Sequence, residues 1–172
     1  MKNIVNVVYL LLGTNMGQRS KNLATARQEI SEKMGDLHHQ SSVFETEPWG
    51  ITNQPAFYNQ VLVVHTFLQP EQLLTLIHQI EHEMGRERKE RYGARIIDID
   101  ILFFNQEVYH SHRLSIPHPR ISERNFVLAP LSEIAPDLIH PVLQQPLHEL
   151  LKQSKDPLQA VKIQESTEEH FQ

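Results

Sequence analysis

Strand-like and helix-like apolar patterns alternate in a fixed order between residues 4 and 104, and this order restricts the fold more than any other feature. Strands are expected where apolar or β-branched residues run together or alternate, at residues 4–12, 39–47, 58–67 and 95–104. Helices are expected where apolar residues recur every three or four positions, at residues 20–34, with Ser20 as the cap, and 70–84. The order strand–helix–strand–strand–helix–strand predicts an α+β fold, with a ferredoxin-like βαββαβ core and an antiparallel sheet.

Prolines divide the rest of the chain into short segments. C-terminal helical additions are expected between Pro117 and Pro157, one of them capped by Ser122 and interrupted by Pro130, where they would cover exposed sheet. We therefore expect a single domain over residues 1–160, followed by a C-terminal tail over residues 161–172.

Positive charge is concentrated in one part of an otherwise acidic chain. The 172 residues have a formal net charge of −5, and no Lys or Arg lies between Lys33 and Arg86. Half of the 16 basic residues then fall in the stretch from Arg86 to Arg124. This distribution favours a local anionic ligand such as a polyphosphate, and we expect no nucleic-acid partner.

The absence of cysteine restricts the environment and the metal chemistry of the chain. It excludes disulfides and thiolate metal sites, and a reducing cytoplasm is the expected location. The apolar segment at residues 4–12 is too short to span a membrane and has no cleavage signal after it. We expect a cytoplasmic monomer with no membrane partner.

Asp98 and Asp100 are two acidic residues in a strongly apolar predicted strand. Because strand side chains alternate, both aspartates are expected on one face, with Ile97, Ile99 and Ile101 on the other. Two carboxylates in apolar surroundings repel each other and lose hydration, and a divalent cation would remove that conflict. Oxygen ligands without cysteine favour Mg²⁺. The alternative is a structural network in which both aspartates pair with neighbouring arginines.

A charged loop bounded by glycines, residues 85–95, leads into this strand. Its arginines are Arg86, Arg88, Arg91 and Arg95. Their planar groups match phosphate oxygens, and the flanking glycines would let the loop close over a ligand as a lid. Arginines for phosphate beside carboxylates for magnesium are the recurring components of phosphoryl transfer. The chain has no P-loop motif, so a nucleotide site would be of another design.

The segment Arg-Tyr-Gly-Ala-Arg-Ile-Ile-Asp-Ile-Asp-Ile-Leu, residues 91–102, resembles the signature of the 6-hydroxymethyl-7,8-dihydropterin pyrophosphokinase family of folate biosynthesis. Further matches follow in family order, among them Leu12-Gly13-Thr14-Asn15, Thr46-Glu47-Pro48-Trp49-Gly50, Phe57-Tyr58-Asn59, Pro117-His118-Pro119 and Arg124-Asn125-Phe126. The resemblance implies an ATP- and Mg-dependent enzyme. It would transfer the β,γ-pyrophosphoryl group of ATP to the hydroxymethyl group of the pterin and release AMP.

The resemblance also implies a role for each matching residue. The catalytic residues would be Arg86, Arg91, Asp98 and Asp100, with two magnesium ions bound by the two aspartates. The nucleotide-binding residues would be Glu81, Arg88, Arg95, Ile101, Arg113, His118 and Arg124. The pterin-binding residues would be Thr46, Trp49, Gly50, Phe57, Asn59, Asp98 and Phe126, with the two phenylalanines on either side of the ring.

Two other classes of function stay open at the level of sequence. Residues 78–82 spell the His-x-x-Glu-His motif of inverted zinc proteases, in which His78 and His82 would share a zinc ion. A ferredoxin-like sheet can also be a non-enzymatic binding module for RNA or small regulators. That function would require basic and aromatic residues on a face of the sheet.

Overall fold

The computed structural model describes residues 4–48, 50, 53–86 and 93–164. Its strands are β1 (Asn6–Thr14), β2 (Asp36–Gln40), β3 (Phe44–Thr46), β4 (Phe57–Thr66), β5 (Asp98–Phe104), β6 (Tyr109–His110), β7 (Ser115–Ile116) and β8 (Val161–Lys162). Its helices are α1 (Arg19–Lys33), α2 (Pro70–Glu83), α3 (Asn125–Ile134), α4 (Leu147–Gln153) and the 3₁₀ turn η1 (Ile121–Glu123).

The main sheet is antiparallel, with the strand order β5-β1-β4-β3-β8 and with β2 also paired to β4. Its central strand β1 determines which side chains meet across the sheet. Gly13 of β1 lies opposite Asn59 of β4 on one side and opposite Asp98 of β5 on the other. Leu11 of β1 lies opposite Asp100 of β5. Asn59 and Asp98 are therefore separated by a residue without a side chain.

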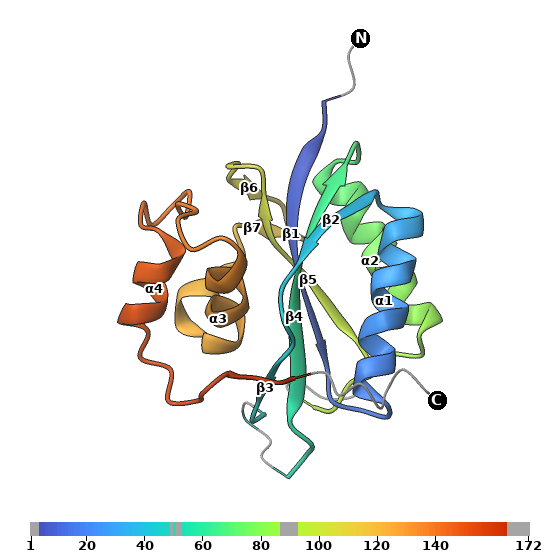
Figure 1. The fold of residues 1–172 in the computed structure, drawn as a ribbon. Helices are drawn as coiled ribbons and strands as arrows, with labels where there is room; N and C mark the ends of the chain where they lie inside the picture. Colours follow the sequence, from blue (N-terminus) through green and yellow to red (C-terminus); the bar gives the residue numbers. More distant parts are fainter. Residues whose placement is uncertain (1–3, 49, 51–52, 87–92, 165–172) are drawn as a thin grey trace.

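Helices cover both faces of this sheet (Figure 1). α1 and α2 pack on one face around a core that includes Leu10 and Ile77. α3 and α4 pack on the other face around a second core that includes Leu102 and Leu128. The ferredoxin-like core and the C-terminal helices over exposed sheet are thus confirmed. None of the described helices is both long enough and apolar enough to cross a lipid bilayer.

Helix α2 begins and ends at signals that are visible in the sequence. Pro70 occupies its first turn, and the side chains of Gln69 and Gln72 form a reciprocal capping box with the backbone. The chain leaves the helix through Gly85, whose φ of 91° suits glycine. The next residue, Arg86, is thereby directed from the end of α2 toward β5.

Two predicted boundaries near the N-terminus were wrong. Helix α1 begins at Arg19, so Ser20 lies inside the helix and does not cap it. The single strand expected at residues 39–47 is divided into β2 and β3. The division occurs because the Ser41 hydroxyl accepts a hydrogen bond of 2.9 Å from the Val61 amide and interrupts the regular backbone ladder.

Two predictions for the C-terminal part need correction as well. Pro130 lies inside α3 without interrupting it, and it is buried, as is Leu131. The tail expected at 161–172 does not begin at residue 161, because Val161 pairs with Glu45 of β3. Without β8, the strand β3 would lie at the edge of the sheet with unpaired backbone groups, and β8 pairs with some of these groups.

Candidate active site

Strand β5 presents its two aspartates on the face opposite its isoleucines. Ile97, Ile99 and Ile101 are buried in the core under α1 and α2. Asp98 and Asp100 both line two adjoining pockets. The alternation expected from the sequence is therefore confirmed.

The first pocket, which we call the aromatic pocket, lies beside β1, β4 and the start of α3. It is concave and opens to solvent, so a small molecule can enter it. Its lining residues are Leu11, Gly13, Thr46, Glu47, Phe57, Asn59, Arg95, Asp98, Asp100, Arg124 and Phe126. Two aromatic rings together with an amide suit a flat ligand that has hydrogen-bonding edges.

Two buried polar groups of the aromatic pocket have no hydrogen-bond partner among the described residues. They are Thr46 Oγ1 and Asn59 Nδ2. The two residues are only 2% and 4% exposed. A buried unsatisfied group costs about 1–3 kcal/mol, and a ligand with matching polar atoms would remove that cost.

Gly13 keeps the aromatic pocket open beside the Asn59 amide. A Cβ atom at this position would lie 3.0 Å from Asn59 Oδ1 and 4.0 Å from Cδ1 of Phe57. The first of these contacts is short enough to require the amide to shift. Gly13 therefore contributes to the site because its missing side chain leaves room for the Asn59 amide.

The second pocket, which we call the histidine pocket, lies at the free edge of β5 beside α2 and the β6–β7 hairpin. Its lining residues are Leu74, His78, Glu81, Asp98, Ile99, Asp100, Ile101, Arg113, Leu114, Ser115, His118 and Pro119. Asp98 and Asp100 line both pockets, so they stand at the boundary between the two.

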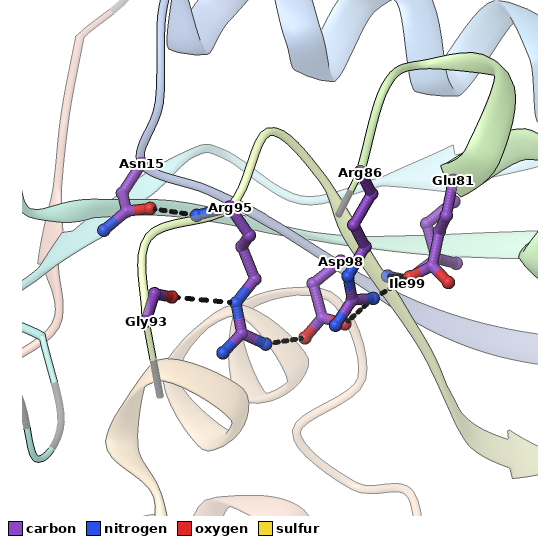
Figure 2. Close-up of polar contacts among 7 residues, drawn as sticks. All are labelled: Asn15, Glu81, Arg86, Gly93, Arg95, Asp98 and Ile99. Atoms are coloured by element: carbon purple, nitrogen blue, oxygen red, sulfur yellow. Dashed lines mark hydrogen bonds and ion pairs between the residues drawn. The ribbon is translucent and has the colours of Figure 1, made fainter. Parts of the chain in front are cut away.

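Asp98 is held between two arginines (Figure 2). Arg86 Nη1 lies 2.7 Å from Asp98 Oδ1, and Arg95 Nη1 lies 3.1 Å from Asp98 Oδ2. Arg86 also pairs with the carboxylate of Glu81, whose side chain is 5% exposed. A buried carboxylate needs a cation, which explains why Arg86 lies here and lines neither pocket. The alternative of a structural ion-pair network is thus realised for Asp98.

Asp100 differs from Asp98, because no residue in the described part of the chain forms an ion pair with it. Burial raises the pKa of Asp100 well above its usual range, and the charges of Asp98 and Glu81 add to that effect. Burial also raises the pKa of Glu81, although Arg86 and the Ile99 amide oppose the rise. This surplus of negative charge would be relieved by a bound cation.

Asn15 holds the segment that carries Arg95 against the loop before β4. Its side-chain Oδ1 accepts a hydrogen bond of 2.8 Å from the Arg95 backbone amide (Figure 2). The backbone amide of Asn15 donates to the Arg95 carbonyl at 3.1 Å. Its Nδ2 donates to Gln54 Oε1 and to the Pro55 carbonyl, both at 2.9 Å. This buried side chain therefore fixes the backbone from which the Arg95 guanidinium extends.

His118 is neutral at physiological pH. Burial lowers its pKa to about 4, and the positive charge of Arg124 contributes to the shift. Its Nδ1 accepts a hydrogen bond of 3.2 Å from the Arg120 amide, so the ring is oriented as well.

Stability should therefore fall as the pH is lowered from 6.5 to 4. The unfolded chain protonates this histidine near pH 6.5 and the folded chain near pH 4, so the unfolded state binds more protons in between. We expect His118 to contribute a loss on the order of 2 kcal/mol to the free energy of unfolding. Urea unfolding of His118→Gln should show a smaller loss, whereas the exposed His112→Gln should match the parent. Equal losses in all three proteins would contradict this interpretation.

The structure brings most of the predicted site residues to the two pockets, while their roles stay predictions. The predicted pterin-binding residues in the aromatic pocket are Thr46, Phe57, Asn59, Asp98 and Phe126. The predicted nucleotide-binding residues in the histidine pocket are Glu81, Ile101, Arg113 and His118. Arg95 and Arg124, expected at phosphates, line the aromatic pocket.

Some predicted residues lie elsewhere, and some lining residues were not predicted. Gly50 is exposed and lines neither of the two pockets. Trp49, Arg88 and Arg91 lie outside the described residues. Leu11, Gly13 and Glu47 were missed, although the last two lie within the motifs that carry the family resemblance. The pairing of β1 with β4 and β5, which brings Leu11 to the pocket, is not visible in the local pattern.

An oxygen-only magnesium site fits Asp98 and Asp100. Within residues 4–48, 50, 53–86 and 93–164, no group of three or more His, Asp or Glu side chains could hold a metal ion. Two carboxylates are a typical protein contribution to Mg²⁺ binding, because water and phosphate oxygens supply the remaining ligands.

The two alternative functions find no support in the described residues. His78 and His82 are exposed, while Glu81 between them is buried and hydrogen-bonded to Ile99 and Arg86. This geometry does not form a zinc site. A binding module with an open sheet face is contradicted by the helices on both faces (Figure 1).

Comparison with known proteins gives consistent matches. The family model described as 7,8-dihydro-6-hydroxymethylpterin-pyrophosphokinase (HPPK) matches residues 9–136. The chain is 41% identical over 142 residues to 2-amino-4-hydroxy-6-hydroxymethyldihydropteridine pyrophosphokinase of Aquifex aeolicus, covering 83% of this chain and 88% of that protein. It is 45% identical over 135 residues to folic acid synthesis protein fol1 of Pneumocystis carinii, covering 78% of this chain but only 18% of that longer protein.

Solved structures support the fold. HPPK-DHPS of Plasmodium falciparum superposes with a TM-score of 0.74 at 21% identity, over 88% of this chain and 46% of that one. An α+β fold with two pockets that share a pair of carboxylates fits a transferase that acts on a phosphorylated substrate. The chain belongs to the 6-hydroxymethyl-7,8-dihydropterin pyrophosphokinase family, as the sequence motifs predict. It is therefore an enzyme of pyrophosphoryl transfer in folate biosynthesis, with ATP as co-substrate.

Proposed function

We propose that the chain transfers the β,γ-pyrophosphoryl group of ATP to the hydroxymethyl oxygen of 6-hydroxymethyl-7,8-dihydropterin and releases AMP. The observation that carries this proposal is the pair of pockets with Asp98 and Asp100 at their boundary. Two substrates bound in these adjoining pockets would have their reacting groups close together beside the shared aspartates. Such positioning is a large part of phosphoryl-transfer catalysis.

The aromatic pocket is the proposed pterin site. Phe57 and Phe126 would stack on the two faces of the ring, which is a favourable use of aromatic side chains. The unsatisfied atoms of Asn59 and Thr46 would bond to its polar edge. Trp49 and Gly50 are assigned to this site by the family resemblance alone.

The histidine pocket is the proposed site of the nucleotide. Arg113 and His118 would contact its phosphates, with Glu81 and Ile101 beside them. Arg95 and Arg124 line the aromatic pocket beside the shared aspartates, so they would meet the transferred phosphates at the boundary. Arg86, Arg88 and Arg91 are proposed phosphate contacts by resemblance, and Arg86 would have to exchange its pairing with Glu81 and Asp98 for phosphate.

The proposed reaction is an in-line displacement at the β-phosphorus. The hydroxymethyl oxygen attacks the β-phosphorus, and the bond between the β-phosphorus and the oxygen that bridges to the α-phosphorus breaks. AMP leaves with that oxygen, and the hydroxyl proton passes to solvent water. Asp98 and Asp100 would hold two Mg²⁺ ions, which supply neutralisation of phosphate charge and orientation of the reacting oxygens. Arg95 and Arg124 would add fixed positive charge beside the migrating group.

The proposed setting is the cytoplasm, where a cysteine-free chain needs no oxidation. We propose a monomer that binds neither nucleic acid nor membrane. The support is the acidic net charge of −5 and the position of Arg95, Arg113 and Arg124 in the linings of the two pockets.

The direct test of this function is the nucleotide product. Incubation with ATP, Mg²⁺ and 6-hydroxymethyl-7,8-dihydropterin should yield one AMP for each pterin consumed, and no AMP without the pterin. Release of ADP, or release of AMP at the same rate without the pterin, would refute the proposal.

Gly13→Ala should weaken pterin binding selectively. The added methyl group would push against Asn59 Oδ1, whose amide is proposed to read the ring. We expect the KM for the pterin to rise about fivefold to tenfold, while the KM for ATP stays within about twofold, because the effect is confined to one pocket. Steady-state kinetics with each substrate varied in turn would measure both values. An equal rise in both would mean that Gly13 acts on the fold as a whole.

A further inference from the structure

The polypeptide after α4 connects two walls of the aromatic pocket. Residues 154–163 run from the end of α4 past α3 to β3 along the lower side of Figure 1. The family match ends at residue 136, so this segment lies beyond it. Its contacts fall on elements that carry pocket residues.

The first contact is between Asp156 and the start of α3. Asp156 Oδ2 accepts a hydrogen bond of 2.9 Å from the Asn125 amide, and Oδ1 accepts one of 2.9 Å from the Leu158 amide. The Asn125 side chain donates in return to the carbonyls of Asp156 and Leu158, at 3.2 and 2.8 Å. The residue at the cap position, Arg124, makes no side-chain cap of its own. Asp156 therefore caps α3 from a distant part of the chain.

This cap lies between two pocket residues. Arg124 and Phe126 are the immediate neighbours of Asn125, and both line the aromatic pocket. The Arg124 guanidinium lies 5.5 Å from the centre of the Phe126 ring. A shift of the backbone at Asn125 would therefore move the Arg124 guanidinium and the Phe126 ring together.

The second contact is with β3, which carries Thr46. β8 pairs with β3, and the Ile163 amide donates a hydrogen bond of 3.0 Å to the Val43 carbonyl. Lys162 Nζ also lies 3.4 Å from Glu133 of α3. The same segment thus connects the strand of Thr46 to the helix that begins beside Phe126.

We infer that residues 154–163 form a strap that sets the geometry of the pterin pocket, with Asp156 as the positioning residue for Arg124 and Phe126. The inference rests on the proposed function only in naming the pterin as the ligand of the pocket. No residue of the strap is among the lining residues of either pocket, so the strap acts through the residues that it holds.

Kinetics of Asp156→Ala test this inference. The KM for the pterin should rise about tenfold because Phe126 is displaced, and kcat should fall by about twofold to fivefold because Arg124 moves with it. Asp156→Asn keeps the acceptor for the Asn125 amide and should raise this KM less than Asp156→Ala does. Lys155→Ala, which changes an exposed neighbour, should match the parent. A fall in kcat at unchanged KM would instead indicate partial unfolding and overturn the inference.

Hydrogen exchange supplies a readout that does not depend on activity. Asp156→Ala should accelerate amide exchange in peptides that contain Asn125, whereas Lys155→Ala should not. If Asp156→Ala does not fold, Ile163→Pro removes the donor to Val43 and should accelerate exchange around Thr46, while Ile163→Val should not. Parental exchange in the folded variants would refute the strap. A parent that forms no AMP would refute only the proposed reaction.

Discussion

Asp100→Ala should lower kcat by roughly 10³-fold or more, since a lost metal ligand removes several kcal/mol of charge stabilisation. Asp100 lines both pockets and forms no ion pair with a described residue, so no described arginine occupies the place of a cation beside it. Pterin affinity should be largely retained, because the stacking rings and the Asn59 amide are unchanged. Single-turnover kinetics would measure the first quantity and equilibrium titration with the pterin the second.

The fold should survive this substitution, which makes the result interpretable. Burial raises the pKa of Asp100, so the ionised side chain destabilises the folded state at neutral pH. Asp100→Asn removes the charge without changing the shape, and it should raise Tm while losing activity to a similar extent. Asp137→Ala, at a side chain that is 94% exposed, is the matched control and should keep full activity. Full activity in Asp100→Asn would rule out a metal role for this residue.

Arg95→Ala should lower kcat/KM by roughly 10²-fold, the cost of removing a fixed charge from a transferring phosphoryl group. The guanidinium lies 3.1 Å from Asp98 at the boundary of the pockets, and Asn15 holds the backbone beneath it. Arg95→Lys keeps the charge but loses the planar fork, so it should recover only part of the activity. Both values come from the AMP-release assay.

Arg120→Ala provides the control for this prediction. Its side chain is 47% exposed and pairs with Glu123 at 3.8 Å, outside the linings of the two pockets. The variant should keep parental kinetics. If Arg95→Ala also stays within about twofold of the parent, the boundary arginine makes no contact with the migrating group in the transition state.

The fold was largely predictable because its signals are local. The helical repeat before Gly85, the alternation in β4 and the apolar strand around Asp98 each determine an element without knowledge of its neighbours. The division of 39–47 was not predictable, because it depends on the Ser41 hydroxyl meeting a backbone amide from β4. Pairing of Val161 with an edge strand is likewise a long-range event.

The candidate site was predictable to the extent that motifs carry it. The spacing of Asp98 and Asp100 determines a shared face through strand geometry alone. The pairing of Arg86 with Glu81 was missed, because the sequence does not show that the Glu81 carboxylate is buried against β5. The strap was missed for a similar reason, since the sequence does not show that Asp156 lies beside the start of α3 and accepts a hydrogen bond from Asn125.

The central claim is that the two carboxylates at the pocket boundary hold the divalent cations, and metal titration tests it most directly. Mn²⁺, which replaces Mg²⁺ and is visible by electron paramagnetic resonance, should bind the parent at two sites in the presence of α,β-methylene-ATP. Asp98→Ala and Asp100→Ala should each weaken that binding by about tenfold or more, while Asp137→Ala leaves it unchanged. Parental Mn²⁺ affinity in Asp98→Ala and Asp100→Ala would contradict the account.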